Sequence, residues 1–140
     1  MRPSAAGQAL IETAITIPVL LLLLLGFLLA MVVSEAYVDL DTATSLAAAS
    51  AVTARAGDDA QSRDFALKTY RGTLVRTGYL KPGALDGCGG YAAGGSVACA
   101  GHARLLLSRT PMAILEPFNP DWTLDLQATA TAYSSPYRST

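Results

Sequence analysis

Two cysteines and a single histidine, Cys88, Cys99 and His102, are the most reactive side chains of this sequence. They would supply only three of the four ligands that a structural zinc ion takes, and the cysteines are widely spaced for a zinc motif. In an oxidising compartment the cysteines would instead form a disulfide, closing a loop of 12 residues. We therefore predict a disulfide between Cys88 and Cys99, with His102 as an exposed loop residue rather than a general base.

Other residue patterns that suggest chemistry are incomplete. The glycine run from Gly87 to Gly90 lacks the third glycine at the required step and the Lys-Ser/Thr pair of a phosphate-binding loop. Glu35 and Asp39 lie one helical turn apart and suggest a cation site, but solvated charges holding a helix end out of a membrane explain them more simply. Trp122 and its neighbours are predicted to belong to the core. No nucleophile–base pair is visible, so we expect neither an enzyme nor a cofactor or metal.

One acidic residue, Glu12, stands at the edge of a long apolar segment, where burial of its charge would be costly. In the simpler interpretation Glu12 sits in the membrane interface and its side chain reaches water. In the functional interpretation it needs an amine close by. Cleavage between Gly7 and Gln8 would create an α-amine four residues before Glu12, on the same helical face.

The apolar segment itself runs from Thr13 to Ser34 without a charged residue. Its 22 residues at helical rise cover roughly 33 Å, enough for a hydrocarbon core of about 30 Å. No polar face interrupts it, which favours a membrane span over a buried core helix. Arg2 precedes the span and Glu35 follows it, so we expect a cytoplasmic N-terminus and a C-terminal part outside the cytoplasm.

A single helix is predicted to continue from the span into water. Residues 35–56 contain no proline or glycine, and apolar residues recur at steps of three and four. The predicted face consists of Tyr37, Leu40, Ala43, Ala47 and Ala51. We expect a leader at 1–7, a helix at 8–56 that Gly57 ends, and a small extracytoplasmic domain at 57–140.

That domain is predicted to be of the α+β class, with a second helix followed by an antiparallel sheet. Asp58 and Asp59 are suited to the start of the helix and Gly78 to its end. Its predicted face consists of Leu67, Tyr70, Leu74 and Thr77. The glycine-rich residues 81–101 are predicted to form a loop. Strict alternation predicts a strand from Asp121 to Tyr133, with Arg104 to Thr110 as its partner and a wide turn at Pro111, Pro117 and Pro120 between them.

The stretch from Gly7 to Met31, GQALIETAITIPVLLLLLLGFLLAM, resembles the N-terminus of TadE-like proteins, which are minor pilins or pseudopilins of the tight-adherence (Tad) subclass of type IV pili. These proteins share a short leader ending in glycine, a glutamate at the fifth position after the cut, and an apolar helix that commonly has a proline near the position of Pro18. The alanine-rich residues 45–57 and the closing strand near Tyr133 are also similar. The resemblance covers about 50 of the 140 residues.

The resemblance implies a structural role rather than catalysis. A prepilin peptidase would cut between Gly7 and Gln8, and the amine of a neighbouring subunit would meet Glu12 as the helices assemble. Two charges too costly to bury singly can enter an apolar bundle as a pair. The implied partners are the membrane, the peptidase, the major pilin and other minor pilins, in a pilus for surface adhesion or secretion.

Two other classes of protein share much of this pattern. A membrane-anchored extracytoplasmic binding module unrelated to pili would have the same topology but would need neither the cut at Gly7 nor the acid at Glu12. A secreted protein would be cleaved at Ser34-Glu35-Ala36 and begin at Tyr37. The net charge of −1 and the scattered basic residues exclude a concentrated nucleic-acid-binding surface.

Overall fold

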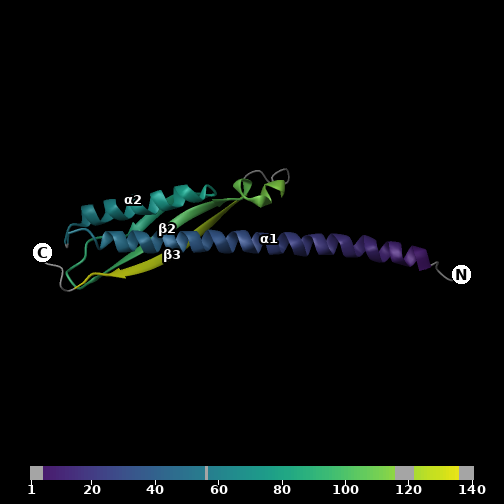
Figure 1. Ribbon diagram of the computed structural model, residues 1–140, viewed down its shortest axis with the longest axis horizontal. Helices are drawn as coiled ribbons and strands as arrows, with labels where there is room; N and C mark the ends of the chain where they lie inside the picture. The colour runs from purple at the N-terminus through teal and green to yellow at the C-terminus, as the bar shows by residue number, and fades with distance from the viewer. Residues whose placement is uncertain (1–4, 56, 116–121, 136–140) are drawn as a thin grey trace. The chain divides into compact units, whose positions relative to one another are not determined.

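The computed structural model describes residues 5–55, 57–115 and 122–135 of the chain (Figure 1). These residues form two compact units, one ending at Val32 and the other beginning at Val33. Arg2, Ala56, Pro117, Pro120 and Asp121, on which parts of the sequence predictions rest, lie outside the described residues.

The first unit is the N-terminal part of one long helix, α1, which spans Ala5–Ala51 and contains Pro18. Most of its side chains from Leu10 onward are apolar and exposed. Within the described residues, this is the one helix that is long and apolar enough to cross a membrane.

The second unit consists of two helices and a three-stranded antiparallel sheet, which confirms the predicted α+β class. After α1 come α2 (Asp59–Thr77), β1 (Leu80–Gly87) and β2 (Ser96–Leu106). Two 3-10 helices follow, η1 (Leu107–Arg109) and η2 (Pro111–Leu115), and β3 (Thr123–Tyr133) is the last strand. The strand order β1-β2-β3 follows the chain, so each strand pairs with its neighbour in sequence.

The part of α1 in this unit buries a narrow face of small side chains. The apolar residues that are 0–1 % exposed lie on one face: Ala36, Leu40, Ala43, Ala47, Ala48 and Ala51. Four of the five predicted face residues are among them, but Tyr37 is 50 % exposed. Ala36 takes its place because a step of four back from Leu40 leads to residue 36.

A close approach of both helices to the middle of β2 explains why small residues dominate there. Gly101 is buried, and a Cβ at this position would meet the hydroxyl of Thr44 in α1 and, at 2.9 Å, the ring of Tyr70 in α2. Any side chain at 101 would therefore push the helices away from the sheet. The Tyr70 hydroxyl donates a hydrogen bond of 2.6 Å to the carbonyl of His102, which ties α2 to the same strand.

The second helix begins and ends as predicted. The Asp58 carboxylate accepts a hydrogen bond of 2.9 Å from the backbone N–H of Gln61, and Gly78 adopts a left-handed conformation at the C-terminus. Its buried face includes Tyr70 and Leu74, as predicted, together with Ser62 and Ala66 nearer its start.

The predicted loop at 81–101 is wrong for most of its length, because β1 and the first half of β2 lie within it. Two of the glycines that suggested a loop, Gly83 and Gly87, instead permit close contacts between paired strands. Gly87 has a φ of 76°, and a Cβ there would clash with the carbonyl of Ala98 on the paired strand. Pro82 is tolerated because β1 lies at the edge of the sheet and is bulged between Pro82 and Leu85.

The last strand confirms the predicted alternation but differs at its start. Leu126, Ala128, Ala130 and Ala132 are the less exposed residues of β3, whereas Trp122 and Leu124 are 43 % and 39 % exposed. The prediction that Trp122 belongs to the core is therefore wrong. Its position just before an edge strand, which has a neighbour on one side only, accounts for the exposure.

The partner of β3 also differs from the sequence prediction. It is β2 over its full length, Ser96–Leu106, rather than residues 104–110. Leu107–Arg109 forms a 3-10 helix, in which the Thr110 N–H donates to the carbonyl of Leu107.

Candidate functional site

The residues predicted for processing and assembly lie on one uninterrupted helix. Gly7 and Gln8 belong to the first turns of α1, and Glu12 follows one turn later. An α-amine at residue 8 would therefore lie about 6 Å along the helix axis from Glu12. The carbonyl of Glu12 accepts a hydrogen bond of 2.7 Å from the Thr16 hydroxyl, and the residue is exposed.

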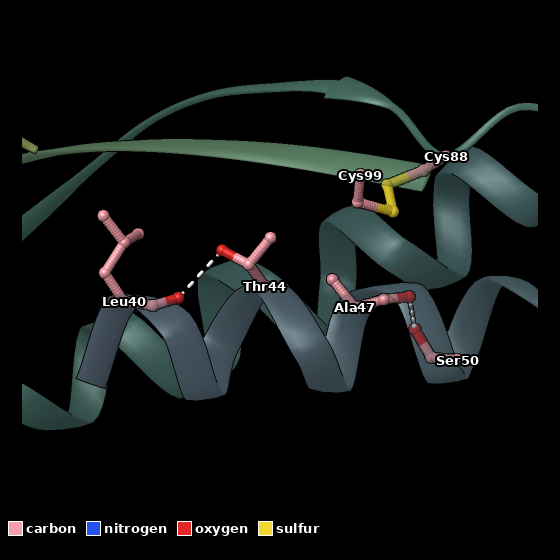
Figure 2. The surroundings of a disulfide bond; sticks show 6 residues. All are labelled: Leu40, Thr44, Ala47, Ser50, Cys88 and Cys99. Carbon is pink, nitrogen blue, oxygen red and sulfur yellow. Dashed lines mark hydrogen bonds between the residues drawn. A yellow bond between two sulfur atoms is a disulfide. The ribbon is translucent and has the colours of Figure 1, made fainter. Parts of the chain in front are cut away.

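The two predicted disulfide partners are joined. Cys88 and Cys99 have Cα atoms 4.8 Å apart and form a disulfide between the end of β1 and the adjacent β2. Figure 2 shows this bond together with the α1 residues around it, among them Thr44 and Ala47. Both cysteines are buried, so the disulfide is part of the core.

A tyrosine inside the disulfide-closed loop holds the C-terminal end of α1. The Tyr91 hydroxyl lies 2.7 Å from the carbonyl oxygen of Val52 and 2.6 Å from that of Ala54, and either oxygen can accept its hydrogen bond. The Tyr91 carbonyl accepts a hydrogen bond of 3.0 Å from the N–H of Gly57. These contacts satisfy carbonyls of the residues just after α1, which ends at Ala51 instead of the predicted residue 56.

At the other end of the domain, a groove of about 380 Å³ lies beside the residues that follow the apolar segment. It is lined by Ser34, Glu35, Val38, Asp39 and Tyr79. The Tyr79 hydroxyl donates a hydrogen bond to the Asp39 carboxylate, which connects α1 to the segment between α2 and β1. No group of three or more metal-ligating residues occurs within the described part of the chain.

Burial raises the pKa of Tyr79 to about 12, with further contributions from its hydrogen bond to Asp39 and from the negative charges of Asp39 and Glu35. Tyrosine in an unfolded chain titrates near pH 10. Below that pH Tyr79 keeps its proton in both the folded and the unfolded state, and its contribution to the free energy of unfolding is complete. Between about pH 10 and pH 12 the unfolded state loses its proton first, so the free energy of unfolding falls.

We therefore expect the stability advantage of the wild type over Tyr79→Phe to shrink as the pH rises from 9 to 11. Thermal unfolding of both proteins in detergent, followed by circular dichroism, measures this difference. Asp39→Asn keeps the shape of the partner and removes its charge, so Tyr79 should ionise at lower pH in that variant, seen by tyrosinate absorbance. If the stability advantage of the wild type stays constant through pH 11, the raised pKa of Tyr79 is contradicted.

The sheet face opposite the helices carries ionisable side chains in pairs. His102 lies within β2 and is partly buried, so its prediction as an exposed loop residue is wrong. Its Nε2 lies 3.3 Å from an Asp86 oxygen, and Arg104 donates a hydrogen bond of 3.0 Å to Asp125. A depression of about 510 Å³ is lined in part by Lys81, His102, Arg104 and Asp125. Paired surface charges of this kind contribute little to stability.

Sequence reasoning missed the two tyrosines that connect α1 to the rest of the domain. Tyr79 directly follows the predicted end of the second helix, and Tyr91 directly follows a glycine run. The sequence signal for each is an aromatic residue among small or polar neighbours. Such a residue indicates that its segment packs against another part of the protein, but it does not identify that part.

No protein-family model matches the sequence, and neither the curated proteins nor the solved structures include a match.

Proposed function

We propose that this protein is a subunit of a Tad-type pilus, a TadE-like minor pilin or pseudopilin that takes part in assembly of the filament. One observation carries the proposal: Gly7, Gln8, Glu12 and the apolar segment follow each other without interruption on α1, which continues into the α+β domain. A membrane-anchored binding module unrelated to pili would not need these residues in this order.

In this proposal the apolar part of α1 spans the cytoplasmic membrane, with the N-terminus in the cytoplasm and the domain outside. The buried disulfide supports this orientation, because disulfides persist in oxidising compartments. The prepilin peptidase cuts between Gly7 and Gln8 and leaves the span in place. The mature helix then joins neighbouring helices through its exposed apolar side chains, such as Leu22 and Phe27.

The proposal is tested by the N-terminus of the protein extracted from membranes that contain the peptidase. We expect a mature chain beginning at Gln8, detected by intact-mass analysis. Gly7→Leu should leave the leader attached, because the bulky side chain replaces the small residue at the cut. As a matched control, Gly26→Leu alters a glycine within the span around which no atom lies within 4 Å of an added Cβ, and cleavage should continue.

An intact Met1 in the presence of an active peptidase would overturn the pilin assignment. A chain beginning at Tyr37 would instead identify a secreted protein.

A further inference from the structure

The α+β domain has two distinct ends, and its hydrogen bonds identify the one at which the chain enters. Asp39, six residues after the domain begins, accepts a hydrogen bond from the hydroxyl of Tyr79. The carbonyl of Tyr79 accepts from the N–H of Leu106 at 2.9 Å, and the N–H of Leu107 donates to the carbonyl of Trp122 at 3.3 Å. Trp122 therefore belongs to the end at which the chain enters.

The opposite end holds the last residue of β3. Tyr133 pairs with Ser96 at the start of β2, and the next residue, Ser134, donates its N–H to the carbonyl of Gly95 at 2.9 Å. Tyr91 lies in this same loop region and holds the end of α1. An 11-residue strand thus separates Trp122 from Tyr133, a distance of roughly 35 Å.

Large apolar side chains are exposed at the entry end. Trp122, Leu124 and Tyr37 are 39–50 % exposed, and Val38 is more exposed still. We call these four residues the entry surface. Leaving them in water forgoes the free energy that covering their apolar surface would release.

Charged groups also occur at this end, which limits what could cover it. Glu35 is exposed beside Val38, and the exposed Arg109 donates a hydrogen bond of 3.2 Å to the carbonyl of Gly78. Such groups are too costly for the hydrocarbon core but are compatible with the headgroup region. Tryptophan and tyrosine are enriched at that depth, where the ring meets apolar matter and the polar atom meets water.

We propose that the entry surface rests on the headgroup region of the same lipid bilayer that α1 crosses. The inference relies on the proposed membrane anchoring. The apolar segment ends at Ser34, only three residues before Tyr37. Chain connectivity alone keeps the entry end near the bilayer, and Trp122 and Leu124 supply apolar side chains on an element far away in sequence. The partner is therefore a lipid surface.

Trp122 is the single tryptophan of the chain, so the unmodified protein contains its own reporter. The full chain is reconstituted into phosphatidylcholine vesicles, with and without bromine atoms high on the acyl chains. Because an indole at the headgroup level approaches these atoms, we expect the emission of Trp122 to fall roughly twofold in brominated vesicles.

Two variants make the result specific. In Trp122→Phe/Tyr133→Trp the reporter moves to the opposite end of β3, where the native side chain is 78 % exposed, and bromine should leave its emission unchanged. In Trp122→Phe/Phe27→Trp the reporter lies in the apolar segment, and brominated vesicles should quench its emission if α1 enters the bilayer.

Each outcome decides between the proposals. Quenching at position 27 without quenching of Trp122 overturns the lipid contact and leaves the anchor intact. Equal quenching at 122 and 133 also overturns it, because the contact would then not be confined to the entry surface. Absence of quenching at position 27 overturns the anchor and, with it, the lipid contact.

Discussion

Glu12→Gln is expected to leave membrane insertion and cleavage after Gly7 intact while abolishing entry into the filament. The glutamine keeps the shape of the side chain and removes its charge. In an assembled bundle, the amine of a neighbouring subunit would then be buried without its partner, at a cost of about 3–5 kcal/mol. Cross-linking to the major pilin, scored beside membrane abundance and cleavage, measures the effect.

The matched control is Asp41→Asn, which removes another exposed acid from the same helix, outside the apolar segment. Substitutions at such positions change stability by about 0.5 kcal/mol or less, so cross-linking should remain at the wild-type level. If the Glu12→Gln protein cross-links as well as the wild type, Glu12 is an interfacial residue solvated by water, and the pilus assignment loses its main chemical support.

Replacement of both cysteines by serine should lower the free energy of unfolding by about 3 kcal/mol, the value expected for a disulfide that closes a loop of this length. The loss should be localised, because Tyr91 lies between the two cysteines and holds the end of α1 through Ala54. Hydrogen exchange should accelerate most at residues 52–57 and 88–99 and least in the middle of β3.

Tyr91→Phe separates the contribution of the Tyr91 hydroxyl from that of the disulfide. It keeps the ring and the disulfide and removes only the hydroxyl that faces Val52 and Ala54, so its cost should be about 1–2 kcal/mol. Exchange should then accelerate at residues 52–57 alone. Uniform acceleration across the sheet in either variant would contradict a local role for the loop.

The features that local sequence determines could be predicted. The caps of α2 at Asp58 and Gly78 depend on side chains adjacent in sequence, and the alternation of β3 repeats every second residue. The pairing of Cys88 with Cys99 had one solution, because the sequence contains no other cysteine. The apolar segment needs only composition and length to be recognised.

The features that long-range contacts determine could not be predicted. Gly101 looked like a loop residue, but it is required where Thr44 and Tyr70 approach β2 from two different helices. The hydroxyl of Tyr91 meets carbonyls 37 and 39 residues earlier in the chain. No local pattern indicates such a partner, because tertiary packing overrides propensity in these places.

The alanine face of α1 has a mechanical consequence. The domain's own part of α1, residues 33–51, packs through this face, so tension applied to its N-terminal end loads the face along the axis of that part of the helix. The buried contacts from Ala36 to Ala51 are spread along that axis and share the load in shear, rather than being loaded one after another as in peeling. A close-packed interface loaded in this way resists sliding until many contacts yield at once. The domain is thereby suited to remain folded while the chain that precedes it is pulled.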